Sequence, residues 1–205
     1  KILHLASSDS KNEVTALMAL NHPNIIKMYE VFEEGTYFYL ILEYCANGTM
    51  KTFLGDKPDN RLYDTELFTY ILQMTLAIQF CHSKKIAHRD IKPANFLLDN
   101  YNRVRLSDFG LSASLNNSEA LENIRPCGSP AYMAPELLNY RHKPHNHQSF
   151  DVPDESDNKI DLYKADVWSL GITVYEMAVG CKPFMGTLDE IREQVQHSSK
   201  NHKKF

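Results

Sequence analysis

The sequence lacks the features that mark several classes of protein. Its four cysteines, Cys45, Cys81, Cys127 and Cys181, lie far apart among 205 residues and form no C-x-x-C pair. Neither a zinc site nor a disulfide framework is therefore indicated, and a reducing, cytoplasmic compartment is expected. No apolar run approaches the roughly 18 residues that a membrane span needs.

Charge of one sign is also missing. The chain has 22 Lys and Arg against 26 Asp and Glu, which gives a formal net charge of −4. A polybasic surface for nucleic acid or for a membrane is not indicated, so we expect neither as a partner. The oligomeric state cannot be read from the sequence.

The hydrophobic pattern changes once along the chain. Residues 9–20 predict a short helix, and the aromatic and β-branched residues of 27–44 predict a hairpin of two strands. Helical periodicity follows, with one helix over 65–81 and another over 165–180. The second is apolar nearly all round, which predicts a helix buried in the centre of a helical lobe. The sequence therefore predicts an α+β fold, in which one short helix and a hairpin come first and mostly helices follow.

Polar groups are concentrated in HRDIKPANFLLD, residues 88–99, which fits the pattern H-R-D-x-K-x-x-N. The triplet Asp108-Phe109-Gly110 begins thirteen residues after the last residue of this pattern, and Ala134-Pro135-Glu136 comes later. Each triplet alone is a weak signal. The ordered set is a strong one.

Phosphoryl transfer explains these residue types. The reaction needs a carboxylate that orients the attacking hydroxyl and cations that neutralise the γ-phosphate, while Mg²⁺ needs hard oxygen ligands. We assign Asp90 as the catalytic base, Lys92 as a phosphate-binding cation, and Asn95 and Asp108 as the magnesium ligands.

With these motifs the chain resembles the eukaryotic protein kinase family, of the serine/threonine type. The segments HPNIIKMYEVFEE and LSDFGLSASL are most similar to the calcium/calmodulin-dependent and related kinase groups. The resemblance implies a protein-kinase-like bilobal fold with a small β-rich N-lobe (1–44), a hinge (45–48) and a larger α-helical C-lobe (49–205). A polar insertion is expected at about 141–161. Because no glycine-rich loop precedes residue 1 and the last C-lobe helices are missing, it also implies a kinase domain truncated at both ends.

The resemblance further implies ATP and Mg²⁺ as cofactors and a protein with a serine or threonine acceptor as partner. The residues implied for ATP binding are Lys1, Glu13, Leu42, Glu43, Cys45 and Leu97. Lys1 would pair with Glu13 and hold the α- and β-phosphates, although it could instead be an arbitrary start in an exposed strand. Leu42 would be the gatekeeper, and residues 43–45 would offer backbone groups to adenine.

Other residues are implied to support the catalytic loop. Asp166 would hold its backbone, Ser129 would brace Asp90, and His88 would pack under Phe109 in a structural role.

Three alternatives stay open from the sequence. A pseudokinase or scaffold would keep the fold without activity, and a small-molecule phosphotransferase would share the catalytic acid and metal ligands. The histidines at 142, 145 and 147 suggest a zinc site, but further ligands are missing and a solvated loop explains them as well.

Overall fold

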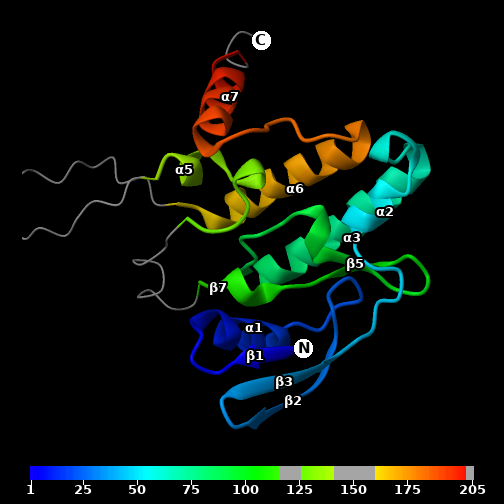
Figure 1. The fold of residues 1–205 in the computed structure, drawn as a ribbon, viewed down its shortest axis with the longest axis vertical. Helices are drawn as coiled ribbons and strands as arrows, with labels where there is room; N and C mark the ends of the chain where they lie inside the picture. Colours follow the sequence, from blue (N-terminus) through cyan, green and yellow to red (C-terminus); the bar gives the residue numbers. More distant parts are fainter. Residues whose placement is uncertain (116–125, 141–159, 202–205) are drawn as a thin grey trace, which may run out of the picture.

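A small antiparallel sheet and one helix form the first lobe of the computed structural model, which describes residues 1–115, 126–140 and 160–201. The strands are β1 (Ile2–His4), β2 (Met28–Glu34) and β3 (Tyr37–Leu42), in the order β1-β3-β2. Helix α1 (Ser8–Ala19) lies beside the sheet, at the bottom of Figure 1. The predicted helix and hairpin are therefore confirmed.

Local sequence explains the hairpin. Strands β2 and β3 are joined by a two-residue turn in which Gly35 has a φ of 60°. Glycine adopts this positive φ with little steric strain because it has no Cβ. Along β3, Phe38 and Leu40 are buried while Tyr37 and Ile41 are exposed, as the period of two in a strand requires. The sheet thus has one face on the core and one face in solvent.

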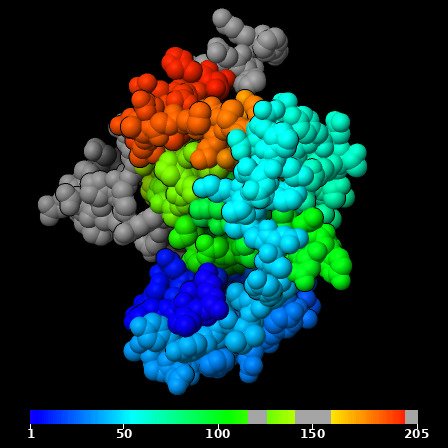
Figure 2. All heavy atoms as spheres, turned by 45° about the vertical axis from the view of Figure 1, so that its right-hand side comes forward, coloured from blue at the N-terminus to red at the C-terminus, as the bar shows by residue number. Residues whose placement is uncertain are grey.

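The second lobe is mainly helical and is larger (Figures 1 and 2). Its helices are α2 (Met50–Gly55), α3 (Asp64–Ser83), α5 (Pro135–Leu138), α6 (Leu162–Val179) and α7 (Leu188–Asn201). Short 3-10 helices are η1 (Pro58–Asn60), η2 (Pro93–Asn95), η3 (Phe109–Leu111) and η4 (Pro130–Tyr132). Two antiparallel strand pairs complete the lobe: β4 (Ile86–Ala87) with β7 (Ala113–Ser114), and β5 (Phe96–Leu98) with β6 (Val104–Leu106). The predicted change to a mainly helical second part of the chain is confirmed.

Helix α6 differs in one respect from its prediction. Its N-cap is Asp161, whose carboxylate accepts hydrogen bonds from two backbone N–H groups of the first turn, and its C-cap is Gly180, with a φ of 87°. The expectation of burial on all sides is wrong, because Val167 is 58% exposed and Val179 43% exposed. Within the described residues α6 packs against α3, β4, η1 and η4, and these elements cover only part of its circumference.

One hydrophobic cluster joins the two lobes. It contains Leu17 and Leu40 from the first lobe and Phe96, Leu106 and Phe109 from the second, all at most 4% exposed. A single chain segment connects β3 to α2 along one side of the molecule (Figure 1). The lobes therefore meet over a shared apolar core with this connection, here called the hinge segment (residues 43–48), at its edge.

Two predicted features lie outside the described residues. These are the histidines at 142, 145 and 147 and nearly all of the polar insertion at 141–161. In the part of the chain that the structure describes, no group of three or more His, Cys, Asp or Glu side chains could hold a metal ion. Among these same residues, no helix is long and apolar enough to span a bilayer.

Candidate active site

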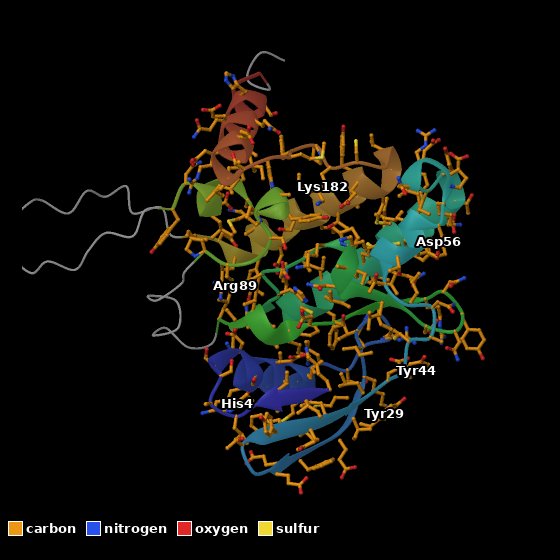
Figure 3. The ribbon with its side chains drawn as sticks, in the orientation of Figure 1. His4, Tyr29, Tyr44, Asp56, Arg89 and Lys182 are labelled. Atoms are coloured by element: carbon orange, nitrogen blue, oxygen red, sulfur yellow. The ribbon has the colours of Figure 1, made fainter. Side chains whose placement is uncertain are left out.

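The loop from His88 to Asn95 is anchored at its start by a buried carboxylate on α6. Asp166 is 1% exposed, and its two oxygens accept hydrogen bonds from the backbone N–H groups of His88 and Arg89, each at 2.8 Å. Arg89 has a φ of 70°, which is uncommon outside glycine, and the bond to Asp166 stabilises this conformation. Figure 3 places Arg89 on the side of the molecule away from the hinge segment, which carries Tyr44.

The carboxylate of Asp90 is fixed by three neighbours. Lys92 Nζ lies 2.6 Å from Oδ2, and Asn95 Nδ2 donates to the same oxygen at 2.9 Å. Ser129 donates to Oδ1 from its backbone N–H and from its hydroxyl, both at 3.2 Å, and accepts a hydrogen bond from Lys92 at 2.9 Å. With a residue exposure of 9%, Asp90 is therefore an oriented carboxylate at the end of a mostly buried network.

These neighbours also set the charge state of Asp90. Burial by itself would raise its pKa, but the hydrogen bond and charge of Lys92 and the hydrogen bond of Asn95 outweigh burial and lower the pKa below its usual value. Asp90 is consequently ionised at neutral pH, which is the form that can receive a proton.

The lowered pKa of Asp90 predicts a specific response to acid. The native carboxyl binds its proton less readily than the unfolded one, so its contribution to stability is complete above the unfolded pKa and is lost as pH falls through the native pKa. Between about pH 6 and about pH 3, the free energy of unfolding of the wild type should fall relative to that of Asp90→Asn. Urea unfolding of both proteins across this range measures the difference, and a constant difference would contradict the lowered pKa.

Asp108 joins the same network through the residue before it. Ser107 donates from its backbone N–H and its hydroxyl to the carbonyl of Asn95, both at 2.9 Å, while Asn95 contacts Asp90. Asp108 itself adopts a left-handed conformation with φ 65° and ψ 68°. The segment of Asp108 is thus connected to Asp90 through Ser107 and Asn95, and joint action of the two acids stays a prediction.

The expected structural role of His88 is confirmed. Its ring packs edge-on against Phe109 with 4.8 Å between ring centroids, and its Nε2 lies 3.0 Å from the carbonyl oxygen of Ser107. Both rings are fully buried, at 1% and 0% exposure. His88 therefore holds the segment before Asp108 in place.

Lys1 reaches the site from the first lobe. Its Nζ lies 2.7 and 2.8 Å from the two carboxylate oxygens of Glu13 on α1, and 3.1 Å from Oδ1 of Asp108. Burial lowers the pKa of Lys1, but hydrogen bonds and charge from Glu13 and Asp108 raise it by more, so the ammonium is retained. The predicted ion pair of Lys1 and Glu13 is thus formed, and Lys1 also contacts the carboxylate of Asp108.

The residues predicted to surround adenine come from both lobes. Leu42 at the end of β3, Cys45 in the hinge segment and Leu97 in β5 are each partly buried and pack against the shared core cluster. The backbone N–H of Glu43 donates to the carbonyl of Lys27 at 2.8 Å. The backbone group that Glu43 could offer to adenine is therefore its carbonyl oxygen, and this contact stays a prediction. Among the described residues none accepts a hydrogen bond from the N–H of Cys45.

Asn95 and Asp108 have the chemistry that a magnesium ion needs. Because the amide nitrogen of Asn95 donates to Asp90, its Oδ1 points elsewhere, and this atom accepts no hydrogen bond from any described residue. Asp108 has a side chain 54% exposed and uses one oxygen on Lys1. Two hard oxygen ligands suit an ion that takes its other ligands from phosphates and water. The residues present fit Mg²⁺.

Sequence reasoning did not single out Gly128. This residue has a φ of 100°, and a Cβ added there would lie 2.6 Å from the carbonyl oxygen of Arg89 and 3.4 Å from Oδ1 of Asp90. Only glycine therefore lets the segment of Ser129 approach the catalytic loop closely enough for its hydrogen bonds to Asp90. The glycine before Ser129 is visible in the sequence, but the close approach is not.

Comparison with known proteins agrees with this geometry. The model of the protein kinase domain matches residues 3–204, so the chain belongs to the protein kinase family. Similar Arabidopsis thaliana proteins include CBL-interacting serine/threonine-protein kinase 10 (34% identical over 176 residues) and CBL-interacting serine/threonine-protein kinase 3 (34% over 186 residues). Serine/threonine-protein kinase RUNKEL from the same plant is 35% identical over 173 residues. The family is thus of the serine/threonine type.

The relatives are much longer than this chain. The matches cover 85%, 88% and 84% of the chain but only 32%, 37% and 11% of the three relatives, in the order named. The similarity therefore concerns only part of the length of each relative.

Proposed function

We propose that the chain is the catalytic part of a serine/threonine protein kinase, which transfers the γ-phosphoryl group of ATP to a hydroxyl of a protein substrate. The observation that carries this proposal is the hydrogen-bond network that links Asp90, Asn95 and the segment of Asp108. Lys1, which is paired with Glu13, contacts the carboxylate of Asp108. Phosphoryl transfer needs positioning and charge stabilisation more than covalent chemistry, and this network supplies both.

The acceptor side of the mechanism rests on Asp90. Its ionised carboxylate would accept a hydrogen bond from the substrate hydroxyl, orient that oxygen towards the γ-phosphorus and receive its proton. Lys92 contacts both Asp90 and Ser129, so its ammonium is held where negative charge develops on the transferring group. Ser129 keeps the carboxylate from rotating.

The nucleotide side rests on Lys1 and the hinge segment. Lys1, held by Glu13, would contact the α- and β-phosphates, and adenine would lie between Leu42 and Leu97 with Cys45 at the hinge. Asn95 and Asp108 would hold magnesium. When bound, this ion neutralises phosphate charge in the transition state.

The compartment and partners are proposed more briefly. The four cysteines are unpaired, which supports a reducing compartment such as the cytoplasm. A protein with an accessible serine or threonine is the proposed substrate, and we propose no nucleic-acid or membrane partner, on the near-balanced charge of the chain.

The test is a phosphorylation assay with the full-length protein, Mg²⁺, radiolabelled ATP and a mixture of protein substrates. We expect label on serine or threonine, and no label above background with Asp108→Asn. ATP binding without transfer under these conditions would contradict the proposal and favour a pseudokinase. Transfer to small molecules alone would favour the other phosphotransferase class.

Gly128→Ala should reduce kcat by about 100-fold, because small displacements of catalytic groups have effects of this size. The new Cβ would collide with the backbone of Arg89 and displace Ser129 from Asp90. Steady-state kinetics with a protein substrate measure the effect.

Gly35→Ala is the matched control for Gly128→Ala. Gly35 also has a positive φ, of 60°, but nothing lies within 4 Å of its added Cβ. This variant should lose about 1 kcal/mol of stability through backbone strain and keep its kcat. Equal loss of kcat in both variants would show that general strain, and not the contact with the catalytic loop, is responsible.

A further inference from the structure

Arg105 on β6 is a buried cation that the proposed mechanism does not use. Its side chain is 8% exposed. Its Nε lies 2.9 Å from each carboxylate oxygen of Glu43, and one terminal nitrogen donates to Asp99 Oδ2 at 3.0 Å. The other terminal nitrogen donates to the carbonyl oxygens of Pro23 and Val104. All parts of the guanidinium are therefore engaged.

These contacts join three separate parts of the molecule. Pro23 lies in the loop between α1 and β2 in the first lobe, Glu43 begins the hinge segment, and Asp99 follows β5 in the second lobe. A planar guanidinium has five donors in a fixed arrangement, so one arginine can hold all three acceptors at once. A lysine could not reproduce this geometry.

The hinge segment is also held on the second lobe at its other end, where the backbone N–H of Leu98 donates to the carbonyl of Gly48 at 2.8 Å. The backbone N–H of Asn47 donates to Leu98 at 3.2 Å, and its amide donates to the carbonyl of Asp99 at 2.9 Å and to Asn102 at 2.7 Å. The strand pair β5–β6, with its turn, thus holds the hinge segment at both ends. At the Glu43 end, the side-chain contact of Arg105 provides this link.

Arg105 also stands next to the proposed adenine pocket without being part of it. It pairs with Leu97 across β5 and β6, so both side chains lie on the same face of the strand pair. On its other side, Arg105 and Glu43 line a pocket of about 160 Å³ with Lys27 and Tyr29, and no other residue assigned to ATP binding lines this pocket. Figure 3 shows Tyr29 and Tyr44 on the same side of the molecule, where the hinge segment runs.

We propose that Arg105 is a positioning residue for ATP: through Glu43 it fixes the hinge backbone whose Glu43 carbonyl and Cys45 N–H meet adenine. The inference rests on the proposed function, since it assumes that ATP binds at this hinge. The pair holds one geometry because the Arg105 side chain is buried and that of Glu43 is 20% exposed. Loss of Arg105 removes the cation that holds the Glu43 carboxylate, whereas loss of the Glu43 charge leaves Arg105 paired with Asp99. Release of Glu43 would therefore let the hinge backbone shift.

The test compares Arg105→Met and Glu43→Gln in the full-length protein. Each should raise the KM for ATP about tenfold and change kcat by less than about twofold, because binding geometry is altered while Asp90 and Asp108 stay in place. Displacement of a fluorescent ATP analogue should show the same rise in dissociation constant. The double variant should bind ATP no more weakly than Arg105→Met alone, since Arg105→Met already removes the contact with Glu43 that Glu43→Gln weakens.

Arg103→Met is the matched control. Arg103 also pairs with Asp99, at 2.8 Å, but its side chain is 55% exposed, and within the described residues it forms no hydrogen bond or ion pair with the hinge segment. It should leave the KM for ATP unchanged. A lowered melting temperature with unchanged KM in Arg105→Met, or equal rises in KM for Arg103→Met and Arg105→Met, would overturn the inference.

A readout without nucleotide separates this inference from the proposed function. Hydrogen exchange of the backbone amides of residues 43–48 should accelerate in Arg105→Met and stay slow in Arg103→Met, whether or not the wild type transfers phosphate. Failure of the phosphorylation assay alone would remove the proposed function and leave this result standing. Unchanged exchange would overturn the positioning role even in an active kinase.

Discussion

Asp108→Asn is expected to lower kcat by about 1,000-fold, since charge stabilisation by a bound metal contributes several kcal/mol to the transition state. The substitution keeps the shape of the side chain and removes the charge that would hold Mg²⁺. It also removes the negative charge 3.1 Å from Lys1, while Glu13 keeps that lysine in place. Single-turnover phosphorylation at saturating ATP measures the loss.

Two further measurements make the Asp108 result specific. Asp56→Asn makes the same chemical change at the exposed end of α2, far from Arg89 in Figure 3, and should keep full activity. Raising the Mg²⁺ concentration should restore part of the activity of Asp108→Asn, because weaker metal binding is compensated by mass action. Activity above one tenth of the wild type at ordinary Mg²⁺ would contradict the role of Asp108.

Asp90→Asn is expected to lower kcat by about 100- to 10,000-fold, which is the usual contribution of general acid–base catalysis. An amide cannot receive the proton of the hydroxyl. Its NH₂ group would also face Lys92 or the donors of Ser129, and the side chain would lose the orientation that these residues give the carboxylate. Kinetics with a protein substrate measure the loss.

Nucleotide binding separates the role of Asp90 from general damage. The ATP dissociation constant of Asp90→Asn should stay within about twofold of the wild type, because none of the residues assigned to adenine contacts Asp90. Its melting temperature shows whether the fold is intact. An intact variant that keeps most of its kcat would mean that Asp90 does not take part in proton transfer or in orienting the hydroxyl.

Much of the fold and the residue types of the site were predictable from the sequence. The periods of two and 3.6 locate the hairpin and the long helices, because each period reflects which side chains must face the core. The motif around Asp90 and the triplet at Asp108 predict phosphoryl transfer, because that chemistry requires a carboxylate, a cation and oxygen ligands. Burial of α6 was overestimated, since apolar composition does not say which neighbours cover a helix.

The rest depended on contacts between distant parts of the chain. Lys1 meets Asp108 across 107 positions, and Arg105 meets Glu43 across 62. Sequence alone gives no sign that Arg105 is buried at the hinge or that Gly128 has no room for a Cβ.

The amino-acid sequence by itself determined which chemical groups this protein has and which local structures carry them, because both depend on residue type and short spacing. Only the tertiary structure decided which groups meet. It decided that the N–H of Glu43 is already hydrogen-bonded and that Arg105 holds the Glu43 carboxylate. The physical reason is that hydrogen bonds and buried ion pairs depend on distances of about 3 Å, and chain folding, not sequence separation, sets such distances.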